Sequence, residues 1–195
     1  WWTWTPDAHD LFARIDQTRW EDVTHNPVLL LRTLERSVLE SHAQNIDFLE
    51  HFDRTLAAFD HYMQSKETWF RQNYPDFDKR PIAYFSTEFG LHETLPIYAG
   101  GLGILAGDHL KEASDLGFPL VARGFIYTQG YFFQHISEDG WQESRRVTLK
   151  FEELPVMPIL DDDGQPLTVS VELPGRTLSA RLWEMHVGRV PLYLL

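Results

Sequence analysis

The chain has 195 residues, a formal net charge of −12 and no cysteine. Its 43% hydrophobic and 24% charged residues are ordinary for a globular protein and exclude a disordered tail or a collagen-like repeat. The lack of cysteine excludes disulfides, cysteine nucleophiles and thiolate metal sites, and it is consistent with a cytoplasmic location.

The acidic balance argues against two classes of partner. The first 80 residues hold 14 acids and 9 bases, and the remaining residues hold 15 and 8. No basic stripe is available to neutralise a nucleic-acid backbone or an anionic membrane surface. No stretch approaches the roughly 18 uncharged apolar residues of a spanning helix. We therefore expect neither a nucleic acid nor a membrane as partner.

Both ends of the chain are apolar. The chain opens on Trp1 rather than Met, and residues 190–195 form an apolar run without a polar tail. We therefore expect the chain to be part of a longer polypeptide. The sequence leaves a monomer and a homo-oligomer both open.

Residues 1–75 carry the signals of successive helices. Thr5, Pro6 and Asp7 combine an N-cap, a first-turn proline and an acid at the positive helix end. Asn26 and Pro27 repeat this start signal. The clearest helix has one apolar stripe with steps of three and four residues, which we expect to face the core. The residues of this stripe are Leu49, Phe52, Leu56, Phe59 and Met63.

A change of composition follows the charged connector at residues 76–81. The apolar run 82–86 is typical of a buried strand, and residues 98–103 form a glycine-rich turn. Residues 104–116 have a helical pattern that ends at Gly117, and the next strand is expected within residues 119–127. A strand, a loop, a helix and a strand in this order predict a βαβ unit with a parallel sheet.

The remainder favours antiparallel pairing. Residues 131–136 form an extended run before a turn at Asp139 and Gly140. Residues 168–173 and 178–186 flank a hairpin turn at 174–175, and residues 189–194 would add a third strand. We expect this part to be an antiparallel insertion on an α/β core.

The glycine-rich segment is the main candidate site. Gly101, Gly103 and Ala106 fit a G-x-G-x-x-A pattern before a helix. Glycines let a backbone approach a ligand closely, and free amides at a helix start attract anions. The preceding strand is too far away for a dinucleotide turn of the usual kind. An anion or sugar site, a structural turn and a dinucleotide site all remain open on this pattern.

Three polar residues are further candidates. Glu88 follows the first strand of the predicted sheet, at the edge where ligands gather, but an N-cap or a loop ion pair is an equal alternative. His92 shares its loop, and Asp108 lies in the next helix, where a surface role is the alternative. Residues 161–164 lack the acid spacing of a calcium loop, so we expect no metal site there.

Several segments together are similar to a known family. Residues 83–93 and 95–111 resemble the N-terminal signature of the α-glucan phosphorylases, which act on glycogen, starch or maltodextrin. The match continues through residues 113–117, 129–132 and 139–142. The chain looks most like the short prokaryotic branch, because residues 1–78 resemble the additional helical N-terminal domain of that branch.

The resemblance implies a fold and a reaction. Residues 79–195 would form the N-terminal part of a glycosyltransferase B catalytic domain, which is Rossmann-like and carries the antiparallel β insertion. Phosphorylases cleave a terminal α-1,4-linked glucose from a glucan with inorganic phosphate and release glucose 1-phosphate. Their cofactor is pyridoxal phosphate, whose phosphate group takes part. The resemblance implies that the cofactor lysine and the catalytic residues lie beyond Leu195.

Some site residues carry over from the family motif. Gly100, Gly101 and Leu102 match the glycine loop whose amides approach substrate phosphate and glucose, and Glu88 matches an acid lining that site. Gly103, His92 and Asp108 are further candidates beside them. A Tyr of the long eukaryotic branch touches the cofactor, but Gly90 stands at its position here, so that contact is not carried over.

Two other functions remain as alternatives. Glycogen or starch synthases share the fold and a Gly-Gly-Leu loop. Their family motif has Lys-Thr before the glycines, to meet the phosphate of a nucleotide sugar, whereas Tyr98 and Ala99 stand at this place here. A non-catalytic glucan-binding module is the second alternative. Phosphate-dependent release of glucose 1-phosphate separates these possibilities.

Overall fold

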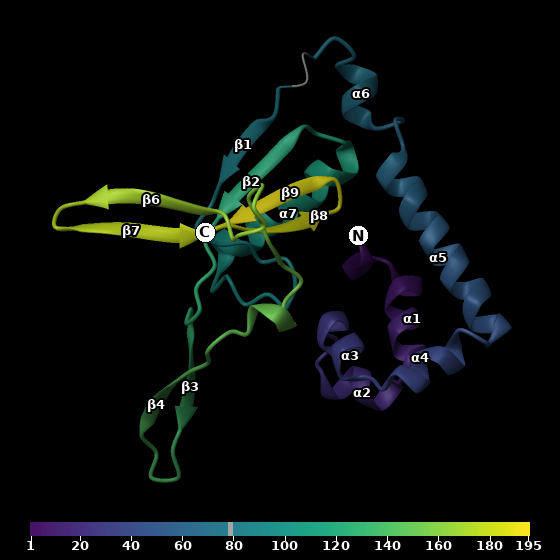
Figure 1. Cartoon of the computed structure of the whole chain (residues 1–195), viewed down its shortest axis with the longest axis horizontal. Coiled ribbons are helices and arrows are strands. Elements are labelled where there is room, and N and C mark those ends of the chain that lie inside the picture. Colours follow the sequence, from purple (N-terminus) through teal and green to yellow (C-terminus); the bar gives the residue numbers. More distant parts are fainter. Residues whose placement is uncertain (78–79) are drawn as a thin grey trace. The chain divides into compact units, whose positions relative to one another are not determined.

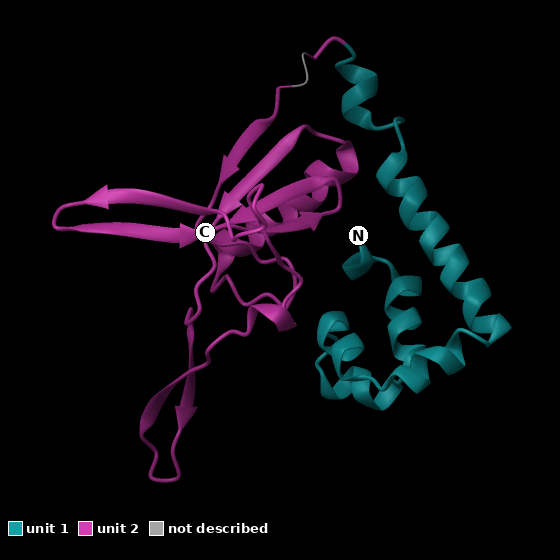
Figure 2. Ribbon diagram, in the orientation of Figure 1, with its two compact units in different colours: residues 1–75 teal, residues 76–195 magenta. Residues whose placement is uncertain are grey.

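The computed structural model describes residues 1–77 and 80–195. They divide into two compact units, residues 1–75 and 76–195 (Figure 1, Figure 2). The boundary expected between residues 78 and 79 lies outside the described residues.

The first unit is helical, as predicted. It begins with a short 3-10 helix, Trp2–Trp4, and its α-helices are α1 (Pro6–Ile15), α2 (Gln17–Asp22), α3 (Pro27–Thr33), α4 (Arg36–His42), α5 (Ile46–Gln64) and α6 (Trp69–Asn73). The side chain of Asn26 caps α3 by accepting the N–H of Leu29 at 3.0 Å. Thr5 stands at the expected N-cap of α1, but its hydroxyl donates to the carbonyl of Trp1 instead of capping the helix.

The expected core face of α5 is wrong. The buried residues of α5 are Phe48, His51 and Thr55, whereas Phe52, Leu56 and Phe59 are 36–43% exposed. The α5 helix packs against α1, and the His51 ring lies 3.0 Å from the guanidinium of Arg14 on that helix. Periodicity identifies residues that share a face, but the neighbouring helix decides which face is covered.

The second unit is built on a mixed five-stranded sheet in the order β1-β2-β9-β8-β5. The strands are β1 (Ile82–Phe85), β2 (Leu120–Gly124), β5 (Met157–Pro158), β8 (Trp183–Val187) and β9 (Val190–Leu194). Helix α7 (Gly101–Leu116) connects β1 to β2, which pair in parallel, so the predicted βαβ unit is confirmed. Gly117 ends α7 in the left-handed conformation with φ +69°.

The expected antiparallel insertion is right only in part. Strand β9 was expected in the insertion, but it pairs in parallel with β2 inside the main sheet. The expected strand 178–186 divides into β7 (Arg176–Arg181) and β8, which pairs with β9. Backbone pairing between distant segments decides this placement, and a local pattern does not report it.

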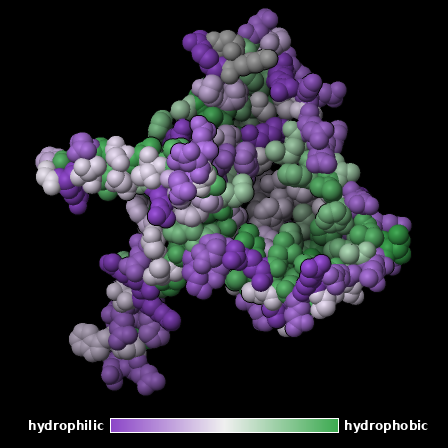
Figure 3. Space-filling view, in the orientation of Figure 1, coloured by the Kyte–Doolittle hydropathy of each residue, from purple (hydrophilic) through white to green (hydrophobic). Residues whose placement is uncertain are grey.

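Two hairpins project from the sheet. Strand β3 (Phe132–Ile136) pairs with β4 (Gln142–Arg146), and β6 (Thr168–Leu173) pairs with β7. Gly140 and Gly175 lie in the two turns with φ +81° and +79°, as the turn signals predicted. A second 3-10 helix, Phe151–Glu153, follows the first hairpin. Polar residues dominate the surface of the β3–β4 hairpin (Figure 3).

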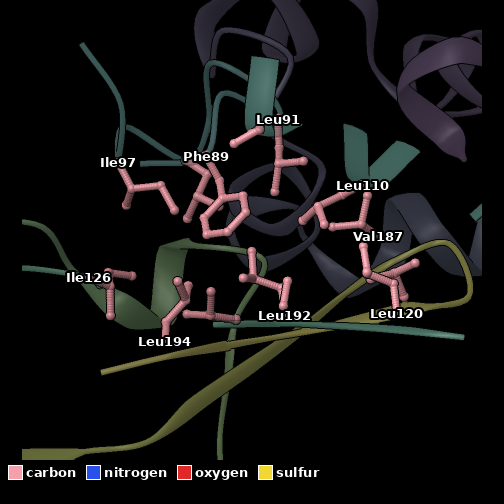
Figure 4. Close-up of a cluster of buried hydrophobic side chains, with 14 of the residues drawn as sticks. Phe89, Leu91, Ile97, Leu110, Leu120, Ile126, Val187, Leu192 and Leu194 are labelled. Carbon is pink, nitrogen blue, oxygen red and sulfur yellow. The ribbon is translucent and has the colours of Figure 1, made fainter. Parts of the chain in front are cut away.

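The core of the second unit lies between α7, the sheet and the loop after β1 (Figure 4). Its fully buried side chains include Phe89, Leu95, Leu110, Leu192 and Leu194. Strand β1 was expected to be buried, but it is the sheet edge, and Phe85 is 75% exposed. No helix in the described part of the chain has the length and apolar character to span a membrane.

Candidate anion site at the start of helix α7

The loop after β1 brings Glu88 to the first turn of α7. The Ser86 hydroxyl donates to the Glu88 carbonyl at 2.8 Å and turns the chain just after the strand. The next residue, Phe89, is fully buried in the core. Alternation between these neighbours leaves the Glu88 side chain at the surface, where it meets the residues that lead into α7.

The Glu88 carboxylate accepts hydrogen bonds from two segments. Its Oε1 accepts the Tyr131 hydroxyl at 2.5 Å, and its Oε2 accepts the N–H of Ala99 at 3.2 Å. These two bonds, with further backbone donation by Gly100 and Gly103, hold the pKa of Glu88 below its usual value. Glu88 is therefore an ionised acceptor at neutral pH and not a proton donor.

Helix α7 begins earlier than expected. The N-cap is Gly100, so Gly101 and Gly103 lie inside the helix and not in a preceding turn. The N–H groups of Gly103 and Ile104 donate to the Gly100 carbonyl at 3.1 and 3.2 Å. Within the described residues, the N–H groups of Gly101 and Leu102 have no acceptor. Such amides, at the positive end of a 16-residue helix, suit an anion or a sugar oxygen.

The glycines of this region fall into two classes. A Cβ on Gly103 would lie 2.4 Å from the Cβ of Tyr98, and a Cβ on Gly107 would lie 2.1 Å from the carbonyl oxygen of Gly90. A Cβ on Gly100 or Gly101 would meet nothing within 4 Å. The packing of the chain therefore does not require glycine at 101. Empty space therefore lies beside Gly101, whose N–H group has no acceptor in the described residues.

The other candidate residues make different contacts. The His92 Nδ1 lies 3.0 Å from the Thr94 hydroxyl in its own loop. Asp108 is exposed on α7, where its charge raises the pKa of Lys111 against the larger, lowering effect of burial. The interactions that set the Glu88 pKa include neither His92 nor Asp108. In the described residues, no cluster of His, Asp or Glu side chains could hold a metal ion.

Tyr131 is a contact residue that sequence reasoning missed. It precedes β3, stands 43 residues from Glu88 in the chain, and is 45% exposed. The bond to Glu88, with burial as a smaller cause, raises the pKa of the Tyr131 hydroxyl to about 12. The residue lies in a segment that carries the family resemblance, but no local pattern links it to Glu88.

Comparisons with known proteins match the whole chain. It is 43% identical over 195 residues to a maltodextrin phosphorylase of Thermococcus litoralis and 44% identical over 195 residues to a glycogen phosphorylase of Aquifex aeolicus. It is 44% identical over 200 residues to a glycogen phosphorylase of Mycobacterium tuberculosis. The chain spans 23–27% of the length of these relatives. A family model described as a protein of unknown function, DUF3417, matches residues 1–95.

Proposed function

Because the chain is homologous over its full length to the α-glucan phosphorylases, we propose that it forms part of a glycosyltransferase that phosphorolyses α-1,4-glucans. Its substrates are a glucan and inorganic phosphate, and its product is glucose 1-phosphate. The observation that carries this proposal is the 43–44% identity to phosphorylases over all 195 residues of the chain. The open amides of Gly101 and Leu102, beside unfilled space at the start of α7, are where this chain would meet an anionic substrate.

The domain assignment is part of the same proposal. Residues 1–78 are the helical N-terminal domain, and residues 79–195 are the first part of a glycosyltransferase B catalytic domain. The parallel strands β1, β2 and β9 support a Rossmann-like half, since parallel pairing joined by a helix is its building unit. The site lies in the loop that follows the carboxyl end of β1, which is where such sheets bind ligands.

Phosphorolysis requires groups that stabilise the negative charge of the phosphate and sugar oxygens. A phosphate oxygen forms a bond to C1 of the terminal glucose, the bond from C1 to the next sugar's O4 breaks, and that O4 takes a proton. The amides of Gly101 and Leu102 donate to anionic phosphate or sugar oxygens as charge redistributes. Glu88 orders these amides through the segment before α7 and, being ionised, does not supply the proton.

Pyridoxal phosphate is the cofactor that the resemblance implies, and in phosphorylases its phosphate group works beside the substrate phosphate. A cofactor lysine needs a buried pocket that shifts its pKa. Among the described lysines, Lys66 and Lys150 are exposed, and Lys111 is half-buried along α7 beside Asp108. The two exposed lysines do not fit the cofactor, burial lowers the pKa of Lys111, and Lys79 lies outside the described residues. The proposal follows the resemblance, which implies a cofactor lysine beyond Leu195.

The test is a product assay on the full-length protein with its cofactor. Incubation with an α-1,4-glucan should release glucose 1-phosphate in proportion to added inorganic phosphate, and no product should form without phosphate. Glucosyl transfer from a nucleotide sugar without phosphorolysis would instead identify a synthase. Glucan binding without either reaction would identify a non-catalytic module.

A further inference from the structure

We propose that Tyr131 is a positioning residue of this site and that it acts through Glu88. The inference rests on the proposed function for its effect on turnover, but its structural part stands on the geometry alone. Among the described residues, the hydroxyl of Tyr131 donates to Glu88 and not to a backbone group of Gly101 or Leu102. Its hydroxyl fixes the carboxylate that orders the segment leading to them.

The two carboxylate oxygens of Glu88 accept hydrogen bonds from separate parts of the chain. Oε1 accepts from Tyr131, which stands between β2 and β3, and Oε2 accepts from Ala99 just before α7. A carboxylate with one oxygen held by a hydroxyl cannot rotate freely about its last side-chain bond. The second oxygen is thereby kept on the backbone donor, and charge-assisted bonds of this kind are stronger than neutral ones.

Helix α7 depends on this carboxylate at its first turn. Gly100 is an N-cap without a side chain, so no side chain at the helix start caps the first amides of α7. Glu88 supplies the negative charge at the positive helix end from a different loop. Loss of the Tyr131 hydroxyl leaves Oε1 to water and frees the carboxylate to turn away from Ala99. The amides of Gly101 and Leu102 then lose their fixed direction.

Positioning and packing are separable here. Tyr131 is 45% exposed, so Tyr131→Phe removes a hydroxyl without opening a cavity in the core. A general structural role would lower the thermal midpoint and kcat together, whereas a positioning role lowers kcat far more than the small loss of stability from one exposed hydrogen bond explains. Tyr127 provides a matched control, because it is 54% exposed, stacks on Phe125 and lies four residues before Tyr131.

The kinetic experiment is a double-mutant cycle in the full-length protein with its cofactor. Tyr131→Phe should lower kcat for phosphorolysis about ten- to a hundredfold, as expected for misplaced donors, with KM for the glucan within about twofold. In a Glu88→Gln background, Tyr131→Phe should have little further effect, because the partner through which it acts is already altered. Tyr127→Phe should behave as the unmodified protein.

Hydrogen exchange of the same proteins tests the contact without turnover. The amides of Ala99, Gly100 and Gly103, which donate to Glu88, should exchange several times faster in Tyr131→Phe than in the unmodified protein or in Tyr127→Phe. Unchanged exchange, a kcat within twofold, or independent effects in the cycle would each overturn the role of Tyr131. An unmodified protein that performs no phosphorolysis would contradict the proposed function, while the exchange comparison would still decide whether Tyr131 orders this segment.

Discussion

Gly107 and Gly90 meet at backbone distance, since a Cβ on Gly107 would lie 2.1 Å from the carbonyl oxygen of Gly90. Helix α7 therefore crosses the loop after β1 without a side chain between them. The N–H of Gly90 also donates to the carbonyl of Gly103 at 2.7 Å. This crossing sets the distance between Glu88 and the first turn of the helix, so the candidate site depends on it.

Gly107→Ala should destabilise the second unit. Alanine normally gains about 1 kcal/mol over glycine inside a helix, but here the methyl group meets a backbone carbonyl that cannot rotate away. We expect a net loss of about 1–3 kcal/mol, as for other overpacked positions. Urea denaturation measures it. Gly101→Ala on the same helix is the control, and a Gly107→Ala protein as stable as that control would contradict the close crossing.

The other end of α7 is held by Arg189. Its backbone N–H donates to the Ser114 hydroxyl at 2.8 Å, and its guanidinium donates to the Ser114 carbonyl at 2.6 Å. Ser114 is 2% exposed, and a cation near a helix C-terminus is favourable. Ser114→Ala removes the acceptor of the Arg189 N–H and should cost about 1–3 kcal/mol.

Ser41→Ala is the comparison for this variant, because Ser41 is exposed on α4. It should change the free energy of unfolding by less than about 0.5 kcal/mol. Equal effects of the two substitutions would show that the contact between Ser114 and Arg189 contributes nothing to stability.

The lowered pKa of Glu88 predicts an acid-dependent contribution to stability. A carboxyl whose pKa falls on folding stabilises the folded state above its ordinary pKa of 4.5, and that contribution is lost as pH falls through the folded value. The thermal midpoint of the unmodified protein should therefore exceed that of Glu88→Gln at pH 7. The difference should shrink below about pH 4.5. A difference that stays constant from pH 7 to pH 3 would mean that the charge of Glu88 is not the stabilising feature.

Local sequence signals predicted the strands and the helix of the sheet unit. Pairing between distant segments determines the position of each strand in the sheet. The apolar run at β1 and the stop at Gly117 were sufficient for a βαβ unit, because both depend on neighbouring residues alone. The place of β9 beside β2 was not predictable, since nothing in either strand records its partner. The early start of α7 at Gly101 was missed because glycine is a poor helix former and its pattern favours a turn.

The candidate site was predictable to the same extent. Glu88 was identified from its place after β1, and the glycines from their spacing. The contact with Tyr131 joins residues 43 positions apart in loops of irregular length, where no period operates. The empty space beside Gly101 was also not predictable. A glycine in a sequence does not reveal whether the packing of the chain or the approach of a ligand requires it.

The last prediction uses that empty space. In the full-length protein, Gly101→Val places a branched side chain in the space where phosphate and glucosyl oxygens would meet the amides. Loss of one preorganised donor costs about a hundred- to a thousandfold in kcat. The thermal midpoint should change little, because a Cβ at 101 meets nothing within 4 Å.

Leu105→Val is the matched control, since it adds a β-branched residue to the same helix at a position that is 68% exposed. Phosphorolysis and the midpoint are measured together for both variants. Activity of Gly101→Val within tenfold of the control would show that Gly101 does not belong to the site. A strongly lowered thermal midpoint would show that the fold, and not a ligand, requires glycine at this position.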